Sequence, residues 1–235
     1  MKPEVTAVIA AAGSGERLGA GGPKAFVPLA GRPMIAWSLD ACRECGSVTA
    51  IVVAVPAGFE QGLEEWKEVA TVAGGGTRAE SVANALAEVA TEFVAIHDAA
   101  RPLLTAALLD DLVAALAAHP EADAIIAAAP VTDTVKKVRV EFRSDRDQNS
   151  TRVEETLDRS TLWGAQTPQV FRTAALRAAL AVDEATRGAA TDEAMLIEAA
   201  GGKVLIHDPG AANLKVTTPL DLRVAELLLA ERESG

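Results

Sequence analysis

VTAVIAAAGSGERLGAGGPK, residues 5–24, is the part of the sequence around which we expect the rest of the chain to be arranged. Its first part, Val5 to Ala12, consists of small and mostly apolar residues, which is typical of a strand buried on both faces of a parallel sheet. The run then breaks into a loop with glycine at positions 13, 15, 19, 21 and 22. Because glycine has no Cβ, such a loop can bend sharply and approach a ligand closely.

Two cations and the glycine spacing bear on what this loop binds. Arg17 and Lys24 follow the strand, where exposed loop amides already favour an anion such as a triphosphate. Gly13, Gly15 and Gly19 give G-x-G-x-x-x-G, which differs from the dinucleotide fingerprint, and no Gly-Lys-Ser/Thr of a P-loop follows. The turn is therefore either a phosphate site or a tight strand-to-helix connection, and the two cations favour the phosphate site.

Length and charge limit the classes of function. At 235 residues the chain can bury a substantial core, and we expect one domain over residues 1–235. The formal net charge of -11 argues against nucleic-acid binding, so a small anion held by a local basic cluster is the better partner. No apolar run reaches membrane-spanning length, so we expect no membrane contact and a cytoplasmic location.

The cysteine and histidine residues do not indicate a metal centre. Cys42 and Cys45 form a C-x-x-C without the second pair that a zinc ribbon needs, so we interpret them as two thiols on a helix face. His97, His119 and His207 lie too far apart in sequence to suggest a metal triad. His119 comes directly before a proline and is expected at the end of a helix.

Alternating strands and helices predict an α/β fold with a doubly wound sheet. Strands are expected at 5–12, 50–55, 69–72, 93–96, 124–129, 204–207 and 214–216, and those at 5–12, 50–55 and 124–129 are expected to be buried. A first helix is expected to start at 31–33, with apolar positions at Ile35, Leu39 and Cys42. Further helices are expected at 60–68, 81–90, 108–118 and 221–231, one follows residues 157–168, and another begins at 191–193. The sequence therefore favours a sheet with helices on its faces.

The segment from Val135 to Thr156 interrupts this alternation. Charges of both signs crowd it, and apolar residues alternate briefly at Val138, Val140 and Phe142. We interpret the segment as a projecting hairpin arm over about 135–156. Such an arm can embrace a second subunit, and a solvated excursion of the chain is the simpler alternative.

The strand expected at 93–96 is followed by HDAARP, residues 97–102. Ligands of open parallel sheets collect beyond the carboxyl ends of the strands, where one carboxylate can hold Mg²⁺ while phosphates and waters supply its other ligands. Asp98 is therefore the candidate metal ligand. The alternatives are that Asp98 caps a helix or pairs with Arg101.

Several short motifs resemble a known family in their order along the chain. The first loop, with AAG at 11–13 and Pro23-Lys24, resembles the signature loop of the nucleotidyltransferases that activate sugars and alcohols. The motifs that follow are GG at 74–75 with Arg78 and Ser81-Val82, HDAARP at 97–102, PVTDTVK at 130–136, LDRSTLW at 157–163, QTPQ at 166–169, TDEA at 191–194 and NLKVTTPLDL at 213–222. Together they resemble the 2-C-methyl-D-erythritol 4-phosphate cytidylyltransferase family of the non-mevalonate isoprenoid pathway over nearly the whole chain.

The resemblance implies a Rossmann-like single domain with a mostly parallel sheet, a homodimer formed through the arm, and a specific reaction. CMP passes from CTP to 2-C-methyl-D-erythritol 4-phosphate, which gives 4-diphosphocytidyl-2-C-methyl-D-erythritol and pyrophosphate. The attacking phosphate oxygen is already ionised at neutral pH, so no general base is needed. Catalysis then depends on positioning and on neutralising charge around the α-phosphorus, with Mg²⁺ as the cofactor that bridges the triphosphate.

The resemblance also assigns roles to matching positions of this chain. Arg17, Lys24 and Lys215 would stabilise the α-phosphate and the departing pyrophosphate. The nucleotide would be held mainly through backbone groups at Ala11, Ala12, Gly13, Gly15, Gly75 and Ser81. Asp98 would bind Mg²⁺ and help to hold the methylerythritol, with Arg101 and Thr167 in the same second site. Thr134 and Arg159 of the arm would grip the substrate phosphate across the dimer.

The chain departs from the family pattern in three places. One is Ala85, which follows Asn84 where glycine is common. Lys24 is followed by Ala25 where glutamine is usual, and the arm between Thr134 and Arg159 is several residues longer, which leaves the contribution across the dimer open. Two other functions also stay open. One is the related cytidylyltransferase for ribitol 5-phosphate, and the other is a nucleotide-binding regulator without turnover, which the retained cations and Asp98 disfavour.

Overall fold

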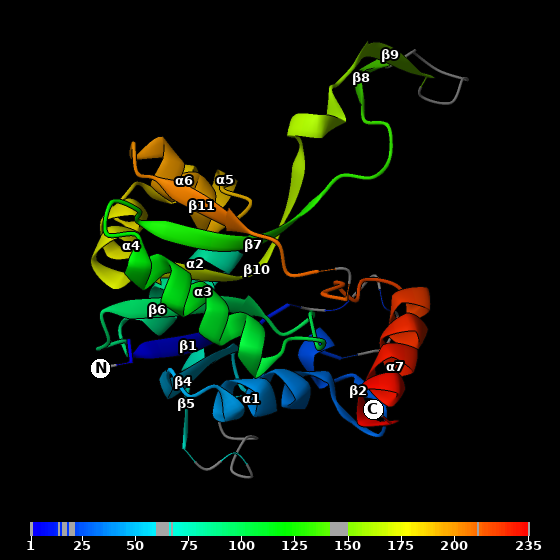
Figure 1. The fold of residues 1–235 in the computed structure, drawn as a ribbon. Helices are drawn as coiled ribbons and strands as arrows, with labels where there is room; N and C mark the ends of the chain where they lie inside the picture. The colour runs from blue at the N-terminus through cyan, green and yellow to red at the C-terminus, as the bar shows by residue number, and fades with distance from the viewer. Residues whose placement is uncertain are drawn as a thin grey trace.

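The computed structural model describes residues 2–13, 15, 18, 22–59, 66, 68–141, 150–210 and 212–234. Its centre is a seven-stranded sheet in the order β11-β7-β10-β6-β1-β4-β5 (Figure 1). The strands are β1 (Val5–Ala10), β4 (Val48–Val55), β5 (Val69–Ala73), β6 (Phe93–Asp98), β7 (Ala124–Pro130), β10 (Trp163–Arg172) and β11 (Val204–His207). β10 is antiparallel to its neighbours β6 and β7, and the other neighbours are parallel. The predicted α/β fold with a mostly parallel central sheet is confirmed.

β1 lies inside the sheet because it is apolar on both faces. It pairs in parallel with β4 and β6, and Val8 lies between Val52 and Ile96. Ala7 and Ile9 pack into the core on one face, whereas Val8 packs into the core on the other. A strand buried in this way needs no alternation of polar and apolar residues, which is why the N-terminal run is almost continuously apolar.

Helices cover both faces of the sheet (Figure 1). They are α1 (Met34–Glu44), α2 (Arg78–Leu86), α3 (Ala106–Ala118), α4 (Thr173–Leu180), α5 (Glu184–Ala189), α6 (Glu193–Ala199) and α7 (Pro219–Ser234). Leu39 of α1 and Leu112 of α3 are buried in the core on one face. Val82 of α2, Leu176 of α4 and Leu196 of α6 are buried in the core on the other. Each such side chain stabilises the fold by about 1.5–3 kcal/mol relative to an exposed one.

A third apolar cluster brings the two ends of the chain together. It contains Leu29 of the short strand β2 (Pro28–Leu29), Val216, and Leu229 of α7, all of them fully or almost fully buried. β2 pairs with β3 (Arg32–Pro33) directly after the glycine-rich loop. The C-terminal segment is therefore packed against the region that follows β1.

α2 begins at Arg78, earlier than the expected 81–90, because of the cap at its N-terminus. The Thr77 hydroxyl accepts a hydrogen bond from the Glu80 N–H at 3.1 Å, and the Glu80 carboxylate accepts one from the Thr77 N–H at 3.1 Å. This reciprocal capping box satisfies two backbone donors that the helix itself cannot. It fixes Arg78 as the first residue of the helix.

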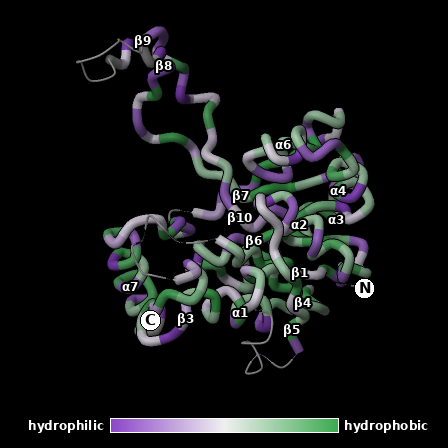
Figure 2. The backbone as a smooth tube through the Cα atoms, turned by 180° about the vertical axis from the view of Figure 1, so that it is seen from behind, coloured by the Kyte–Doolittle hydropathy of each residue, from purple (hydrophilic) through white to green (hydrophobic). Residues whose placement is uncertain are grey.

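β8 (Lys136–Glu141) and β9 (Ser150–Thr156) form a separate two-stranded antiparallel sheet. Figures 1 and 2 show this hairpin away from the seven-stranded sheet. It falls within the segment 135–156 that the sequence had set apart, although Phe142 and the rest of 142–149 lie outside the described residues. Its use as an arm that joins two subunits stays a prediction.

The smaller expectations had mixed outcomes. The strand expected at 214–216 is wrong, because this segment joins no described sheet and Val216 N–H makes one hydrogen bond, to Ala100 O at 2.8 Å. The helix expected at 60–68 lies almost wholly outside the described residues. Cys42 and Cys45 are buried free thiols. Cys42 lies in α1 as expected, whereas Cys45 is the extended residue that follows the helix. Among the described residues, no helix is long and apolar enough to cross a membrane.

Candidate active site

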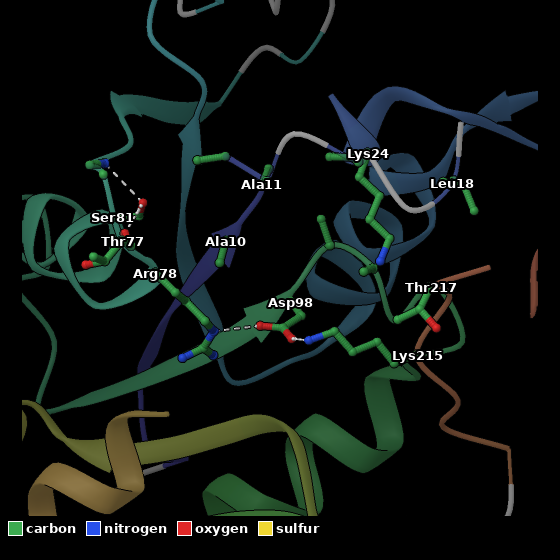
Figure 3. A pocket seen from close by; sticks show the side chains of 18 residues that line it. Ala10, Ala11, Leu18, Lys24, Thr77, Arg78, Ser81, Asp98, Lys215 and Thr217 are labelled. Atoms are coloured by element: carbon green, nitrogen blue, oxygen red, sulfur yellow. Dashed lines mark hydrogen bonds and ion pairs between the residues drawn. The ribbon is translucent and has the colours of Figure 1, made fainter. Parts of the chain in front are cut away.

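A cavity of about 680 Å³ opens at the carboxyl ends of β1 and β6 (Figure 3). The chain passes from β1 to β4 and β5 on one side and returns to β6 on the other, so the strand order reverses here. Open α/β sheets bind their ligands at such a switch point. The cavity is lined by residues 10–13, 15, 18, 24–25, 75–78, 81, 98–100, 215 and 217.

The loop after β1 forms one wall of the cavity. Lys24 N–H donates to Gly13 O at 3.1 Å, and Leu18 N–H donates to Gly15 O at 2.9 Å. Gly15 has a φ of +76°, and a Cβ there would lie 3.0 Å from Gly22 O. A side chain at this position would therefore strain the backbone and collide with the returning loop.

The loop between β5 and α2 forms the opposite wall. Gly75 N–H donates to Ser81 Oγ at 3.0 Å, and the Ser81 hydroxyl donates to Thr77 O at 3.0 Å. A Cβ at Gly74 would lie 2.4 Å from the Cβ of Ala12, so the two walls meet at this point. Small residues on both sides leave backbone groups facing the cavity.

Asp98, the last residue of β6, binds two cations at the cavity (Figure 3). Arg78 Nε donates to Asp98 Oδ1 at 3.0 Å, and Lys215 Nζ donates to Asp98 Oδ2 at 2.6 Å. Burial alone would raise the pKa of Asp98, but the two cations outweigh it and hold this pKa well below its usual range. Neither alternative from the sequence, a helix cap or a pair with Arg101, is the contact that the carboxylate makes.

Arg78 extends this cluster into the protein interior. Its Nη1 donates to the carboxylate of Glu193, whose side chain is completely buried. Burial lowers the pKa of Arg78, but Glu193 and Asp98 together raise it above its usual value. Burial also raises the pKa of Glu193, and Arg78 opposes that shift. Arg78 and Glu193 form an ion pair in which the guanidinium compensates the buried carboxylate.

Arg101 and Thr167 are buried next to Asp98 and do not line the cavity. Thr167 Oγ1 accepts from the Asp98 N–H at 3.0 Å, and Arg101 Nη1 donates to Asn213 O at 2.7 Å. Asn213 Nδ2 in turn donates to Thr167 O at 2.9 Å. These bonds join three of the sequence motifs and fix the backbone that carries Asp98. The substrate-binding roles of Arg101 and Thr167 stay predictions.

The structure brings most of the predicted site residues to this one cavity. Those that line it are Ala11, Ala12, Gly13, Gly15, Lys24, Gly75, Ser81, Asp98 and Lys215. Thr134 and Arg159 lie beside the β8–β9 hairpin instead, and the exposed Arg159 donates from Nη1 to Thr132 O. Arg17 lies outside the described residues.

The sequence matches the model of the 2-C-methyl-D-erythritol 4-phosphate cytidylyltransferase family over residues 5–231. The chain belongs to this family. It is similar to two cytidylyltransferases of that name from Parasynechococcus marenigrum (strain WH8102) and Prochlorococcus marinus (strain MIT 9313). The first is 46% identical over 233 residues and the second 41% identical over 232 residues, with 96% of this chain and 98% of the relative covered in both cases.

Solved structures of the cytidylyltransferase family share the fold of this chain. The 2-C-methyl-D-erythritol 4-phosphate cytidylyltransferase of Thermus thermophilus has a TM-score of 0.76 at 31% identity, with 96% of this chain and 98% of that chain covered. The 4-diphosphocytidyl-2C-methyl-D-erythritol synthase of Anaerococcus prevotii has a TM-score of 0.80 at 26% identity, with 97% of each chain covered. The match to the cytidylyltransferases therefore extends over the whole fold.

Some polar residues in the cavity of this family member had no role assigned from the sequence. They are Thr77, Arg78 and Thr217. The pattern Thr77-x-x-Glu80 is a capping-box signature and could have placed Arg78 at the start of a helix beside the loop. The contact of Arg78 with Glu193 had no such signal, because 115 positions separate the two residues.

Mg²⁺ is the cofactor that the family resemblance implies, and Asp98 is the carboxylate at the cavity that could hold it. In the described part of the chain, no group of three or more His, Cys, Asp or Glu side chains could hold a metal ion. One carboxylate still fits Mg²⁺, which takes one or two carboxylates at phosphate sites and completes its shell with phosphate oxygens and waters. Each Asp98 oxygen also has a second acceptor site beyond the bond described above.

Proposed function

We propose that this protein transfers CMP from CTP to 2-C-methyl-D-erythritol 4-phosphate and releases pyrophosphate and 4-diphosphocytidyl-2-C-methyl-D-erythritol. One observation carries the proposal: Lys24 and Lys215, from opposite ends of a chain that matches this family, line a single cavity beside Asp98. The cavity volume of about 680 Å³ is within the range of roughly 300–1,000 Å³ for small-molecule sites.

The reaction needs positioning and charge neutralisation rather than proton transfer. A phosphate oxygen of methylerythritol phosphate attacks the α-phosphorus of CTP and forms a new P–O bond. The bond from the α-phosphorus to the bridging oxygen breaks, and pyrophosphate leaves with that electron pair. Because the attacking oxygen is already ionised at neutral pH, the protein has to hold two polyanions together and stabilise the charge that develops.

Lys24, Lys215 and Arg17 would supply the positive charge. Lys24 extends from the loop after β1, and Asp98 holds the ammonium group of Lys215 at the cavity (Figure 3). An oriented cation of this kind stabilises the transition state without a rearrangement of solvent, and loss of one such group typically lowers kcat by about 100-fold or more.

The nucleotide would lie between the two loop walls. Ala11, Ala12, Gly13, Gly75 and Ser81 line the cavity there, and none has a side chain larger than a hydroxymethyl group. The closeness of the walls, set by the contact between residues 12 and 74, favours a pyrimidine over a larger purine. Backbone donors and acceptors would then read the edge of the cytosine.

The second substrate would lie beside Asp98, with Arg101 and Thr167 in its surroundings. We propose that Thr134 and Arg159 come from a second subunit and bind the substrate phosphate. Their position outside the cavity of their own chain supports this arrangement, since neither side chain lines that cavity. The protein would then act as a homodimer in which each β8–β9 hairpin completes the partner's site.

We propose that Asp98 also holds Mg²⁺ during turnover. When bound, this ion would neutralise part of the triphosphate charge and favour the departure of pyrophosphate. Since CTP is a nucleotide of the cytoplasm, we also place the reaction there.

Pyrophosphate release tests the proposed reaction. Purified protein with CTP and Mg²⁺ should release pyrophosphate only when methylerythritol phosphate is present, and ATP should replace CTP at least about 100-fold less well. Equal turnover with ribitol 5-phosphate would contradict the assigned acceptor. A rise in melting temperature with CTP but no pyrophosphate from either acceptor would instead indicate a nucleotide-binding regulator.

A further inference from the structure

Four charged side chains of alternating sign form a chain from the interior to the cavity. Glu193 lies at the inner end and contacts Arg78 Nη1, Arg78 Nε contacts Asp98 Oδ1, and Asp98 Oδ2 contacts Lys215 Nζ. Figure 3 shows the outer three members, with Asp98 between the two cations. The innermost carboxylate has no exposed surface, whereas the Lys215 side chain is 42% exposed.

The fold does not need the carboxylate of Glu193 in order to start α6. Asp192 already caps this helix, since its side chain accepts a hydrogen bond from Met195 N–H at 3.0 Å. A carboxylate buried without compensation is strongly destabilising, so a residue at this position would normally be apolar. The contact of Glu193 Oε2 with Arg78 compensates the charge, whereas Glu193 Oε1 is buried without a hydrogen-bond partner among the described residues. The contact with Arg78 indicates what the carboxylate does.

Arg78 is the group through which Glu193 acts. Its Nη2 is buried without a hydrogen-bond partner among the described residues, on the same guanidinium that already binds Asp98 through Nε. A guanidinium can bind both oxygens of one carboxylate through such a pair of donors. If Glu193 lost its charge, Asp98 would be the remaining carboxylate beside Arg78. Asp98 Oδ2 would then move from Lys215 toward Arg78 Nη2.

We propose that Glu193 is a positioning residue of the active site. Because Glu193 pairs with Arg78 Nη1, Asp98 Oδ2 stays available to bind Lys215. This contact keeps the ammonium group of Lys215 in the cavity. The catalytic side of this inference rests on the proposed function, in which Lys215 reaches the α-phosphate. The structural side depends only on the three contacts that join these four side chains.

The first test is Glu193→Gln, which keeps the shape of the side chain and removes its charge. We expect kcat for pyrophosphate release to fall about tenfold while the KM for CTP stays within about threefold, because a positioning charge acts mainly on the transition state. Glu198→Gln makes the same chemical change at an exposed position of α6 and should leave kcat unchanged. Ile197→Val loosens the core beneath the same helix without touching the ion pairs, so its lower melting temperature should leave kcat unchanged as well.

Coupling to Lys215 separates positioning from a general loss of structure. In a Lys215→Ala background, Glu193→Gln should lower kcat by less than about twofold, because the group on which it acts is already gone. An equal tenfold fall in both backgrounds would overturn the proposal.

Glu193→Asp keeps the charge on a shorter side chain and should retain more of kcat than Glu193→Gln. The reverse order would mean that only shape matters. If Glu193→Gln fails to fold, the cycle is run with Glu193→Asp, whose smaller loss of kcat should also disappear in the Lys215→Ala background. A loss that persists in that background would overturn the proposal.

A crystal structure of Glu193→Gln gives a readout that does not depend on the reaction. We expect Lys215 Nζ to lie beyond hydrogen-bond distance of Asp98 Oδ2, with Arg78 bound to both oxygens of that carboxylate. An unchanged contact between Lys215 and Asp98 would refute the inference even if activity fell. If the unaltered protein made no pyrophosphate from CTP and methylerythritol phosphate, the proposed function would fail, and the structural result would still decide the role of Glu193.

Discussion

Gly74 lies at a close contact between the two walls of the cavity. A Cβ there would lie 2.4 Å from the Cβ of Ala12 and 3.1 Å from Ser81 Oγ, so one of the walls would have to move. We expect Gly74→Ala to lower the free energy of unfolding by about 1–3 kcal/mol, as overpacking does in cores. Calorimetry should also show at least tenfold weaker CTP binding, a magnitude of about 1.4 kcal/mol.

A matched glycine substitution shows whether the effect belongs to this contact. A Cβ at Gly164 would meet only Ala129 O, at an ordinary distance of 3.8 Å. Gly164→Ala should therefore leave CTP binding unchanged. Similar losses of CTP affinity in both variants would mean that the contact between residues 74 and 12 does not shape the cavity.

The protonation state of His97 follows from its contacts. Arg101 O can only accept a hydrogen bond, so the proton of the neutral ring lies on Nε2, 3.1 Å from that oxygen. Nδ1 then accepts from the Thr167 hydroxyl at 3.2 Å. Burial lowers the pKa of His97 to about 4, although the nearby Asp98 carboxylate opposes the shift. The neutral ring therefore belongs to the folded state.

This pKa predicts a loss of stability in mild acid. As the pH falls below about 6.5, the unfolded chain takes up a proton at His97 that the folded chain does not accept until the pH nears 4. The free energy of unfolding should therefore decrease across this window, by at most about 3 kcal/mol from this group. Urea unfolding at a series of pH values measures the change. His97→Gln, which has no titrating ring, should show a shallower slope, and parallel curves would contradict the prediction.

Two threonine caps allow the stability of a helix to be distinguished from the geometry of the site. Thr77 caps α2 and lines the cavity, whereas Thr105 caps α3 and accepts from Leu108 N–H at 3.1 Å away from the cavity lining. Replacement of either threonine by alanine should lower the free energy of unfolding by about 1 kcal/mol. Thr77→Ala should also raise the KM for CTP several-fold, because Arg78 starts the helix that this cap fixes.

The comparison of the two caps is direct. Thr105→Ala should show a similar drop in melting temperature in a thermal scan and no change in the KM for CTP. If the two variants changed the KM equally, the effect would come from general stability, and the cap of α2 would have no particular influence on the site.

The elements that could be predicted from sequence are those whose burial follows from local pattern. β1 was predictable because a strand between two parallel neighbours is apolar on both faces. Asp98 was predictable because it lies at the carboxyl end of the buried strand β6. The segment 214–216 also contains apolar residues, Leu214 and Val216, yet it joins no described strand. Its Val216 N–H instead donates a hydrogen bond to Ala100 O in a loop. Pairing partners are a property of the tertiary structure, which a local pattern does not contain.

The same distinction applies to the candidate site. The glycine loop and Lys24 could be predicted because one short stretch contains both the turn and the cation. The contact between Arg78 and Glu193 could not be predicted, because it depends on α2 and α6 packing on the same face of the sheet. The sequence therefore predicted residues that line the cavity better than the residues that hold them in place.

At the scale of the whole molecule, the cavity collects residues from both ends and the middle of the chain. Lys24 comes from the first loop, Asp98 from the central strand β6, and Lys215 from the segment before α7. Thr134 and Arg159 lie apart from them at the β8–β9 hairpin, which extends from the body in Figures 1 and 2. The chain therefore carries some of its predicted site residues where another copy could use them.

Mixed subunits decide whether Arg159 acts across a dimer. If each site uses Lys24 from one subunit and Arg159 from its partner, Lys24→Ala and Arg159→Ala should each be almost inactive alone, whereas an equal mixture regains activity. Half of the randomly mixed dimers combine the two variants, and one of their two sites has both residues intact, so the mixture should reach about a quarter of the unaltered rate. Pyrophosphate release after co-refolding measures this recovery. A mixture no more active than its components would place Arg159 in its own subunit's site or outside the reaction.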